Sequence, residues 1–118
     1  MNVAMTTVTA DLLEEMVDAV VRETDPVRVI LFGSRATGAA GPEADVDLLV
    51  VEGQPFGPGH TRHQELNRIR RALAGFTTPI DILVYTSDEV EKWKDTTNHI
   101  VRTILREGKV LFERSRSF

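Results

Sequence analysis

The sequence predicts one α/β domain that spans residues 1–118, and three observations lead to this prediction. The chain has 118 residues, which is a typical size for a single domain. Predicted helices alternate with short strands along the chain, an order that is typical of α/β proteins. The apolar run at residues 48–51 indicates a strand in a sheet that is covered on both faces over part of its area.

The first half of the chain is predicted to contain one long helix and two strands, with a short turn of helix or a loop over residues 35–44 between the strands. Apolar side chains recur at helical intervals over residues 9–24, with Thr9 as the N-cap and Pro26 as the helix stop. The β-branched run at 27–32 is the first expected strand. The second expected strand is the apolar run at 45–51.

The second half is predicted to contain three helices and two strands after a loop rich in glycine and proline. Ser87 is the expected N-cap of the second of these helices, and Gly108 is expected to end the third. In order, the expected elements are the loop over 52–60, a helix over 61–75, a strand over 79–86, helices over 87–94 and 98–108, and a strand over 109–113.

Composition limits the class of protein. The net charge is −4 at pH 7, so the overall field repels a phosphate backbone, and nucleic acid is not the expected partner. The chain contains no cysteine, which excludes disulfides and thiolate metal sites. No apolar run approaches the ~20 residues that a transmembrane helix needs, and the first residues lack a signal-peptide pattern. We therefore expect a cytoplasmic protein without a membrane partner.

Two aspartates stand at the start of the second expected strand. Side chains alternate between the faces of a strand, so Asp45 and Asp47 point the same way, ~6.5–7 Å apart along the chain. Val46 and Leu48 point to the opposite face, toward the core. Two parallel carboxylates repel each other unless a partner neutralises them, and Mg²⁺ prefers such hard oxygen ligands. This pair is therefore a candidate magnesium site.

A Gly-Ser turn directly after the first expected strand is a candidate phosphate site. A chain that leaves a strand and enters a short helix exposes backbone N–H groups, which can bind phosphate together with the Ser34 hydroxyl. Gly33 has no Cβ and permits a close approach of the backbone. A phosphate site beside a two-carboxylate metal site indicates phosphoryl or nucleotidyl transfer, with two Mg²⁺ ions at the attacking and leaving oxygens.

A third aspartate extends this candidate site. Ile80, Ile82 and Val84 alternate along the third expected strand, so Asp81 joins the face opposite to them. If this strand neighbours the strand at 45–51, three carboxylates converge. Asp81 could then bind one metal ion and accept the proton of an attacking hydroxyl, which is the role of a general base.

Three segments in this order, LFGSRATG, DVDLLV and PIDILV, resemble the nucleotidyltransferase superfamily of the DNA polymerase β type. The pattern of Gly-Ser, Asp-x-Asp and a third Asp is similar in particular to the minimal nucleotidyltransferases, and ILREGKVLFE is similar to their C-terminal helix and strand. The resemblance covers nearly the whole chain. It implies a mixed β-sheet flanked by helices, which is the polymerase β-like nucleotidyltransferase core.

The resemblance also implies a role for each motif. The implied catalytic and metal-binding residues are Asp45, Asp47 and Asp81, and the implied nucleotide-binding residues are Gly33, Ser34 and Arg35. Relatives often have serine immediately before the first aspartate, where this chain has Ala44. That change removes a hydrogen-bonding group but no charge, so we expect an active enzyme.

Members of this family are commonly encoded beside a HEPN-domain toxin and act as its antitoxin, and some transfer AMP from ATP to a toxin tyrosine. The resemblance therefore implies a Mg²⁺-dependent nucleotidyltransferase that uses ATP, AMPylates a HEPN toxin partner and works in a toxin–antitoxin system. A homo-oligomer or a hetero-oligomer with the toxin is compatible with this interpretation.

Two other interpretations remain open at this point. The protein could be an antitoxin that neutralises its partner by binding alone, without transferring anything. It could also be a small-molecule adenylyltransferase of the kind that modifies aminoglycosides, if a dimer supplies the acceptor pocket. The two hypotheses differ in whether the aspartates are needed and in the nature of the acceptor.

Several other polar residues have simpler interpretations. Arg68, Arg70 and Arg71 form either a solvated helix face or a contact to a partner or nucleotide. His60 and His63 are interpreted as part of a solvated helix start, because no third metal ligand lies near them in the sequence.

Overall fold

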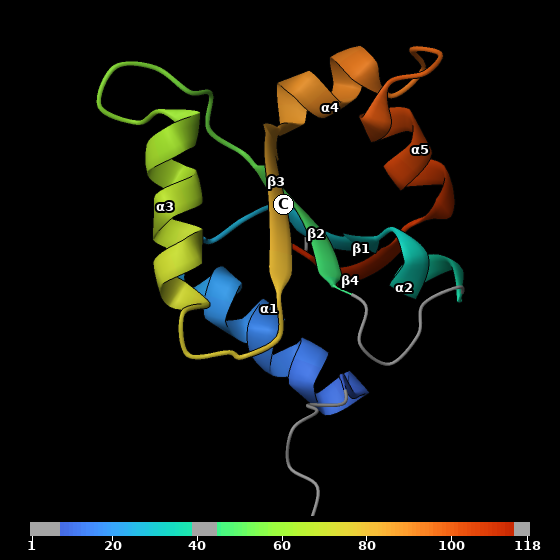
Figure 1. The fold of residues 1–118 in the computed structure, drawn as a ribbon. Helices are drawn as coiled ribbons and strands as arrows, with labels where there is room; N and C mark the ends of the chain where they lie inside the picture. Colours follow the sequence, from blue (N-terminus) through green and yellow to red (C-terminus); the bar gives the residue numbers. More distant parts are fainter. Residues whose placement is uncertain (1–7, 39–44, 115–118) are drawn as a thin grey trace, which may run out of the picture.

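The computed structural model describes residues 8–38 and 45–114 (Figure 1). Among these residues, five helices and four strands follow one another in the order that the sequence predicts. The helices are α1 (Ala10–Thr24), α2 (Ser34–Thr37), α3 (Arg62–Ala72), α4 (Ser87–Trp93) and α5 (Ile100–Glu107), and the strands are β1 (Arg28–Phe32), β2 (Val46–Glu52), β3 (Ile80–Thr86) and β4 (Lys109–Glu113). None of the described helices is long and apolar enough to cross a membrane.

The four strands form one mixed sheet in the order β3-β2-β1-β4. β1 pairs antiparallel with β2 and with β4, whereas β2 and β3 run parallel. A parallel pair requires a long crossover connection, and α3 lies in this connection. The third predicted strand is thus a direct neighbour of the second, which confirms the adjacency on which the convergence of the aspartates depends.

Helices cover both faces of the sheet, as the apolar second strand predicts (Figure 1). On one face, Met16 of α1 and Ile69 of α3 belong to the same buried cluster as Leu48. On the other face, Val101 of α5 is clustered with Leu49. Burial of each such side chain stabilises the fold by roughly 1.5–3 kcal/mol, so β2 is the central support of the domain.

The N-caps of two helices test the prediction of helix starts. Thr9 caps α1 as predicted, and its hydroxyl accepts a hydrogen bond from the backbone N–H of Leu12 at 3.1 Å. The prediction of Ser87 as the N-cap of α4 is wrong, because Thr86 holds that position. Thr86 and Glu89 form a capping box, in which each side chain accepts a hydrogen bond from the backbone N–H of the other residue. Two orphan N–H groups are satisfied in this way.

Two residues at the ends of elements differ from their predicted settings. Gly108 follows α5 as predicted, but its φ of −77° is open to any residue. Glycine is required there because a Cβ would lie 2.5 Å from the carbonyl oxygen of Ile104 and 2.7 Å from Cγ2 of Ile30. Glu52, which was expected to begin a loop, is the buried last residue of β2.

Candidate functional site

The candidate site begins at the turn that joins β1 to α2. Gly33 has φ 73° and ψ −156°, a conformation that residues with a Cβ rarely adopt. The backbone N–H groups of Ala36 and Thr37 donate to the Gly33 carbonyl oxygen at 3.1 and 3.3 Å. Ser34 is exposed and Arg35 is half-buried at the start of α2. The turn therefore presents the hydroxyl of Ser34 directly after a buried strand.

Gly33 also lies against a carboxylate of the neighbouring strand. A Cβ built on Gly33 would lie 2.3 Å from Oδ2 of Asp47 and 3.3 Å from its Cγ. Nonbonded carbon and oxygen atoms do not approach each other to 2.3 Å, so a Cβ at this position would displace either Asp47 or the turn. Glycine is therefore required at this position for two reasons, namely its backbone conformation and the space that Asp47 occupies. The predicted phosphate turn and a predicted metal ligand are thus in direct contact.

Asp47 and Asp81 form a carboxyl pair across β2 and β3. They are register partners on these parallel strands, which lie roughly 4.8 Å apart in a sheet, so both side chains project from the same face. The two carboxyl groups face each other closely enough to share a proton. Partial burial raises the pKa of Asp47, and the charge and hydrogen bond of Asp81 raise it further. The pair therefore favours a bound proton or cation between its oxygens.

Asp45 lies immediately before β2 and is exposed. Its charge contributes to the raised pKa of Asp47, although less than burial and Asp81 do. Within residues 8–38 and 45–114, no three acidic or histidine side chains are grouped closely enough to hold a metal ion. The structure thus brings Asp47 and Asp81 together but does not group Asp45 with them as a third ligand. Ala44, where relatives often have serine, lies outside the described residues.

The chemistry of this donor set fits a divalent cation. Adjacent carboxylates repel each other, and a cation relieves that repulsion without a proton. Mg²⁺ is commonly bound by one or two carboxylates together with phosphate oxygens of a substrate. Asp47 contacts the turn at Gly33 on one side and Asp81 on the other. A nucleotide held at this turn would therefore have its phosphates next to the carboxyl pair.

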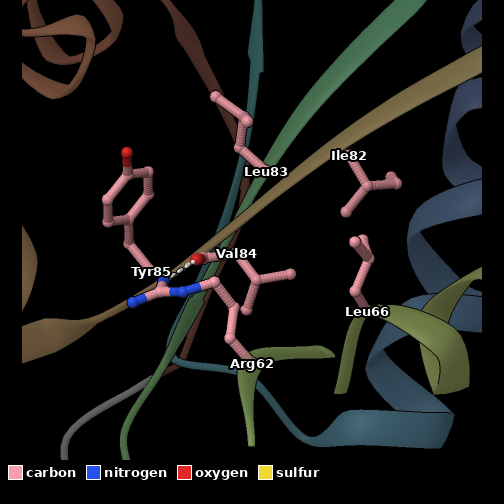
Figure 2. Close-up of a pocket in the computed structure, with 6 residues that line it drawn as sticks. All are labelled: Arg62, Leu66, Ile82, Leu83, Val84 and Tyr85. Carbon is pink, nitrogen blue, oxygen red and sulfur yellow. Dashed lines mark hydrogen bonds between the residues drawn. The ribbon is translucent and has the colours of Figure 1, made fainter. Parts of the chain in front are cut away.

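Sequence reasoning missed a contact that attaches α3 to the outer edge of β3. Figure 2 shows that Arg62 reaches from the start of α3 to this edge, where its Nη1 donates to the carbonyl oxygen of Val84 at 2.5 Å. The same guanidinium forms an ion pair with Glu89 of α4 and lies 5.4 Å from the ring centre of Tyr85. Arg62 and Leu66 help to line a pocket of about 340 Å³ along β3. Arg62 is one of many arginines in the sequence, so only the fold reveals this role.

The basic run on α3 is partly explained by contacts within the chain. Arg68 forms an ion pair with the buried Glu65 at 3.1 Å and another with Glu23 of α1 at 3.4 Å. Arg70 and Arg71 are exposed, as expected of a solvated helix face. Arg68 therefore joins α1 to α3, and the structure assigns it a stabilising role.

Of the two histidines that were interpreted as part of a solvated helix start, only His63 lies in α3. His60 precedes α3 and forms an isolated β-bridge with Gly57, and its ring lies 5.5 Å from that of Phe56. His63 lies in the first turn of α3, where its Nε2 is 3.3 Å from Nδ2 of Asn67. Neither histidine lies in the candidate site.

A match between the sequence and a known family model identifies the family of the chain. Residues 14–117 match the family model described as polymerase beta, nucleotidyltransferase. The chain belongs to this family of nucleotidyltransferases. The match covers α1 from its middle and every later element, including the Gly-Ser turn and all three aspartates. The sequence has no match among curated proteins.

Solved structures show the same fold. A crystal structure from Sulfolobus solfataricus, assigned as a nucleotidyltransferase, has a TM-score of 0.63 and 19% identity, and the alignment covers 92% of this chain and 83% of that chain. A toxin–antitoxin structure with AMP-PNP has a TM-score of 0.51 and 17% identity, with coverage of 86% and 73%. A mutant of the toxin–antitoxin MntA-HpeT has a TM-score of 0.50 and 16% identity, with the same coverage. At sequence identities of 16–19%, these structures show a shared fold and nothing beyond it.

Proposed function

We propose that this nucleotidyltransferase transfers AMP from ATP to a hydroxyl group, namely a tyrosine of a HEPN toxin partner, and thereby acts as an antitoxin. One observation carries the transferase part of this proposal. Asp47 contacts both the Gly33 turn and Asp81, so the turn that we propose as the phosphate site adjoins a carboxyl pair. The likeness of the fold to two toxin–antitoxin structures, one of them with AMP-PNP, supports the choice of nucleotide and partner.

In the proposed reaction, the acceptor hydroxyl oxygen attacks the α-phosphorus of ATP. A bond forms between this oxygen and phosphorus, the bond to the pyrophosphate oxygen breaks, and pyrophosphate leaves. The hydroxyl proton passes to a carboxylate acting as general base. Asp81 is the candidate for this base, because it is exposed at the start of the edge strand β3, where an acceptor can approach it.

The other motif residues bind and orient the nucleotide in this proposal. Backbone N–H groups and the hydroxyl at Gly33 and Ser34 would hold phosphate oxygens, and Arg35 would add a positive charge. Asp47 and Asp81 would hold Mg²⁺, and Asp45, which the structure does not group with them, would have to turn toward them to complete a site for two ions. When bound, such ions neutralise phosphate charge and stabilise the attacking and leaving oxygens.

The test uses the purified protein, its co-expressed toxin partner, Mg²⁺ and ATP labelled at the α-phosphate. We expect label on the toxin with the wild-type protein and a loss of label of at least about a hundredfold with Asp47→Asn. The matched control is Asp18→Asn, which makes the same chemical change on the exposed face of α1 and should leave labelling unchanged. Full labelling with Asp47→Asn would overturn the assignment of this residue.

The same experiment separates the two other interpretations. Neutralisation of the toxin by Asp47→Asn without any label would identify an antitoxin that acts by binding alone. Release of pyrophosphate from ATP that depends on an added aminoglycoside would identify a small-molecule adenylyltransferase. Neither outcome would affect the family assignment, which rests on the sequence match.

A further inference from the structure

A second pair of acidic residues lies at the opposite end of β2 from the candidate site. Glu52 is the last residue of β2, five positions after Asp47, which corresponds to roughly 17 Å along a strand. Glu65 lies on α3. Only 4% of Glu52 and 1% of Glu65 are exposed. Carboxylates are rarely buried to this extent unless they are neutralised, so the pair requires an explanation.

The two residues have unequal sets of partners. Glu65 accepts a hydrogen bond from Nη1 of Arg68 at 3.1 Å, and this ion pair compensates its charge. The carboxyl group of Glu52 faces that of Glu65 closely enough for the two to interact, and Thr24, whose hydroxyl donates to the carbonyl oxygen of Val20 at 2.9 Å, lies beside Glu52. Oε2 of Glu52 is buried and receives no hydrogen bond from any described residue. A carboxylate oxygen can only accept, so a contact between two carboxyl groups needs a proton.

A small cavity borders the pair at the junction of α1, β2 and α3. Its volume is about 210 Å³. The charged and titratable groups that face it, besides Glu52 and Glu65, are Asp25 after α1, His60 before α3, Arg68 on α3 and Arg114 after β4. Of these, Arg68 contacts the pair through Glu65, whereas the side chain of Asp25 is 85% exposed and pairs with Arg114.

We propose that Glu52 and Glu65 share one proton, and that the resulting hydrogen bond links α3 to the end of β2 in a pH-dependent way. This contact between Glu52 and Glu65 is called the joint. Glu52 carries the proton and donates it in a hydrogen bond to the Glu65 carboxylate, which Arg68 neutralises from its other side. Loss of the proton leaves two buried negative charges in contact with only one arginine. The repulsion between them then loosens α3 and α1 from the sheet.

The electrostatics of the pocket agree with this arrangement. Burial raises the pKa of Glu52 to about 8, with additional effects of the hydrogen bond and charge of Glu65, while Thr24 and Arg68 act in the opposite direction. Because the folded state holds a proton that the unfolded chain loses near pH 4.5, the stabilising effect is fully present below that pH. It is lost progressively as the pH rises toward 8.

The first test is a direct titration of the wild-type protein. Carboxyl carbons of glutamate are labelled with ¹³C, and the signal of Glu52 is assigned by its absence from Glu52→Gln and followed by NMR from pH 4 upward. We expect a midpoint well above the ordinary glutamate value, at about 8, because burial and Glu65 both favour the protonated form of Glu52. A midpoint near the ordinary glutamate value of about 4.3 would overturn the proposal.

The second test compares the unfolding equilibrium of three proteins across pH. Glu52→Gln keeps the shape of a protonated carboxyl and donates an amide N–H to Glu65, so it should remove the pH dependence of this joint. Relative to this variant, the unfolding constant of the wild-type protein should rise up to about tenfold per pH unit between about pH 5 and 8. Parallel pH dependence of the wild type and Glu52→Gln would overturn the proposal.

A matched control and a local measurement complete this test. Glu107→Gln makes the same change on the exposed end of α5 and should leave the wild-type pH dependence intact. Hydrogen exchange of α3 amides, corrected for the intrinsic effect of pH, should accelerate above pH 8 in the wild type but not in Glu52→Gln. Equal acceleration in both proteins would exclude the pair as the joint.

Discussion

One strand of this protein carries an acidic pair at each end, and the two pairs have different surroundings. Asp47 pairs with Asp81 at the start of β2, where Asp81 is exposed and a glycine turn lies alongside. Glu52 pairs with Glu65 at the other end of the strand, where both are almost fully buried. The same repulsion between like charges therefore has two solutions, one open to a cation and a substrate, the other closed around a proton.

The comparison shows that exposure, rather than residue type, separates a reactive site from an internal joint. An open carboxyl pair can exchange its proton for Mg²⁺, because water and phosphate oxygens can complete the coordination of the ion. A closed pair next to an arginine offers a cation little access and is stabilised by one proton and one ion pair.

Among variants outside the aspartates, Gly33→Ala is expected to have the largest effect. A methyl group there would lie 2.3 Å from Oδ2 of Asp47, so the aspartate must move, and misplacement of a catalytic group by about 1 Å can cost a hundredfold in rate. Gly38→Ala is the matched control, because Gly38 also has a positive φ, of 82°, but a Cβ there meets no atom within 4 Å. Transfer of label from α-labelled ATP is the measurement.

Gly38→Ala carries the backbone cost of a left-handed residue, about 1–2 kcal/mol, whereas Gly33, at ψ −156°, lies in a region that is nearly restricted to glycine and costs more. The difference between the two variants therefore reports the contact with Asp47 together with this additional backbone cost. We expect Gly38→Ala to retain transfer activity at temperatures well below its unfolding midpoint. Equal activity in the two variants would show that the approach of Gly33 to Asp47 has no catalytic importance.

A smaller effect is expected when Mg²⁺ is added to the protein. Binding to the folded state stabilises it by about 1.4 kcal/mol at tenfold excess over the dissociation constant. The midpoint of thermal unfolding should rise with Mg²⁺ for the wild type and stay constant for Asp47→Asn. Without Mg²⁺, Asp47→Asn should itself be more stable than the wild type, because it removes the repulsion of Asp81. The reverse order without Mg²⁺ would contradict a repulsive pair.

Local patterns in the sequence predicted much of this fold but only part of the site. Strands, helices and the Thr9 cap follow from periodicity and turn chemistry, which act over a few residues. The aspartates were identified by the same local patterns and by resemblance. The contact of Gly33 with Asp47 and the burial of Glu52 could not be predicted, because they depend on strand register and on the packing of α3. Both are interactions between segments far apart in the sequence.

The smallest expected effect concerns the contact of α3 with β3. Arg62→Ala removes a partly exposed ion pair with Glu89 and should lower the free energy of unfolding by at most about 1 kcal/mol. The hydrogen bond from Arg62 lowers the pKa of Glu89, so this contribution is present above the ordinary glutamate pKa and is lost as the pH falls. Urea unfolding at pH 7 and pH 4 measures it, and a larger difference at pH 4 would contradict this account.

The central claim is that the open carboxyl pair supports nucleotidyl rather than phosphoryl transfer, and the position of the label in ATP tests it most directly. The wild-type protein is incubated with the proposed toxin partner and Mg²⁺, once with ATP labelled at the α-phosphate and once with ATP labelled at the γ-phosphate. We predict that only the α-label enters the toxin, and that Asp81→Asn abolishes it. Entry of the γ-label would show transfer of the terminal phosphate and would contradict the claim.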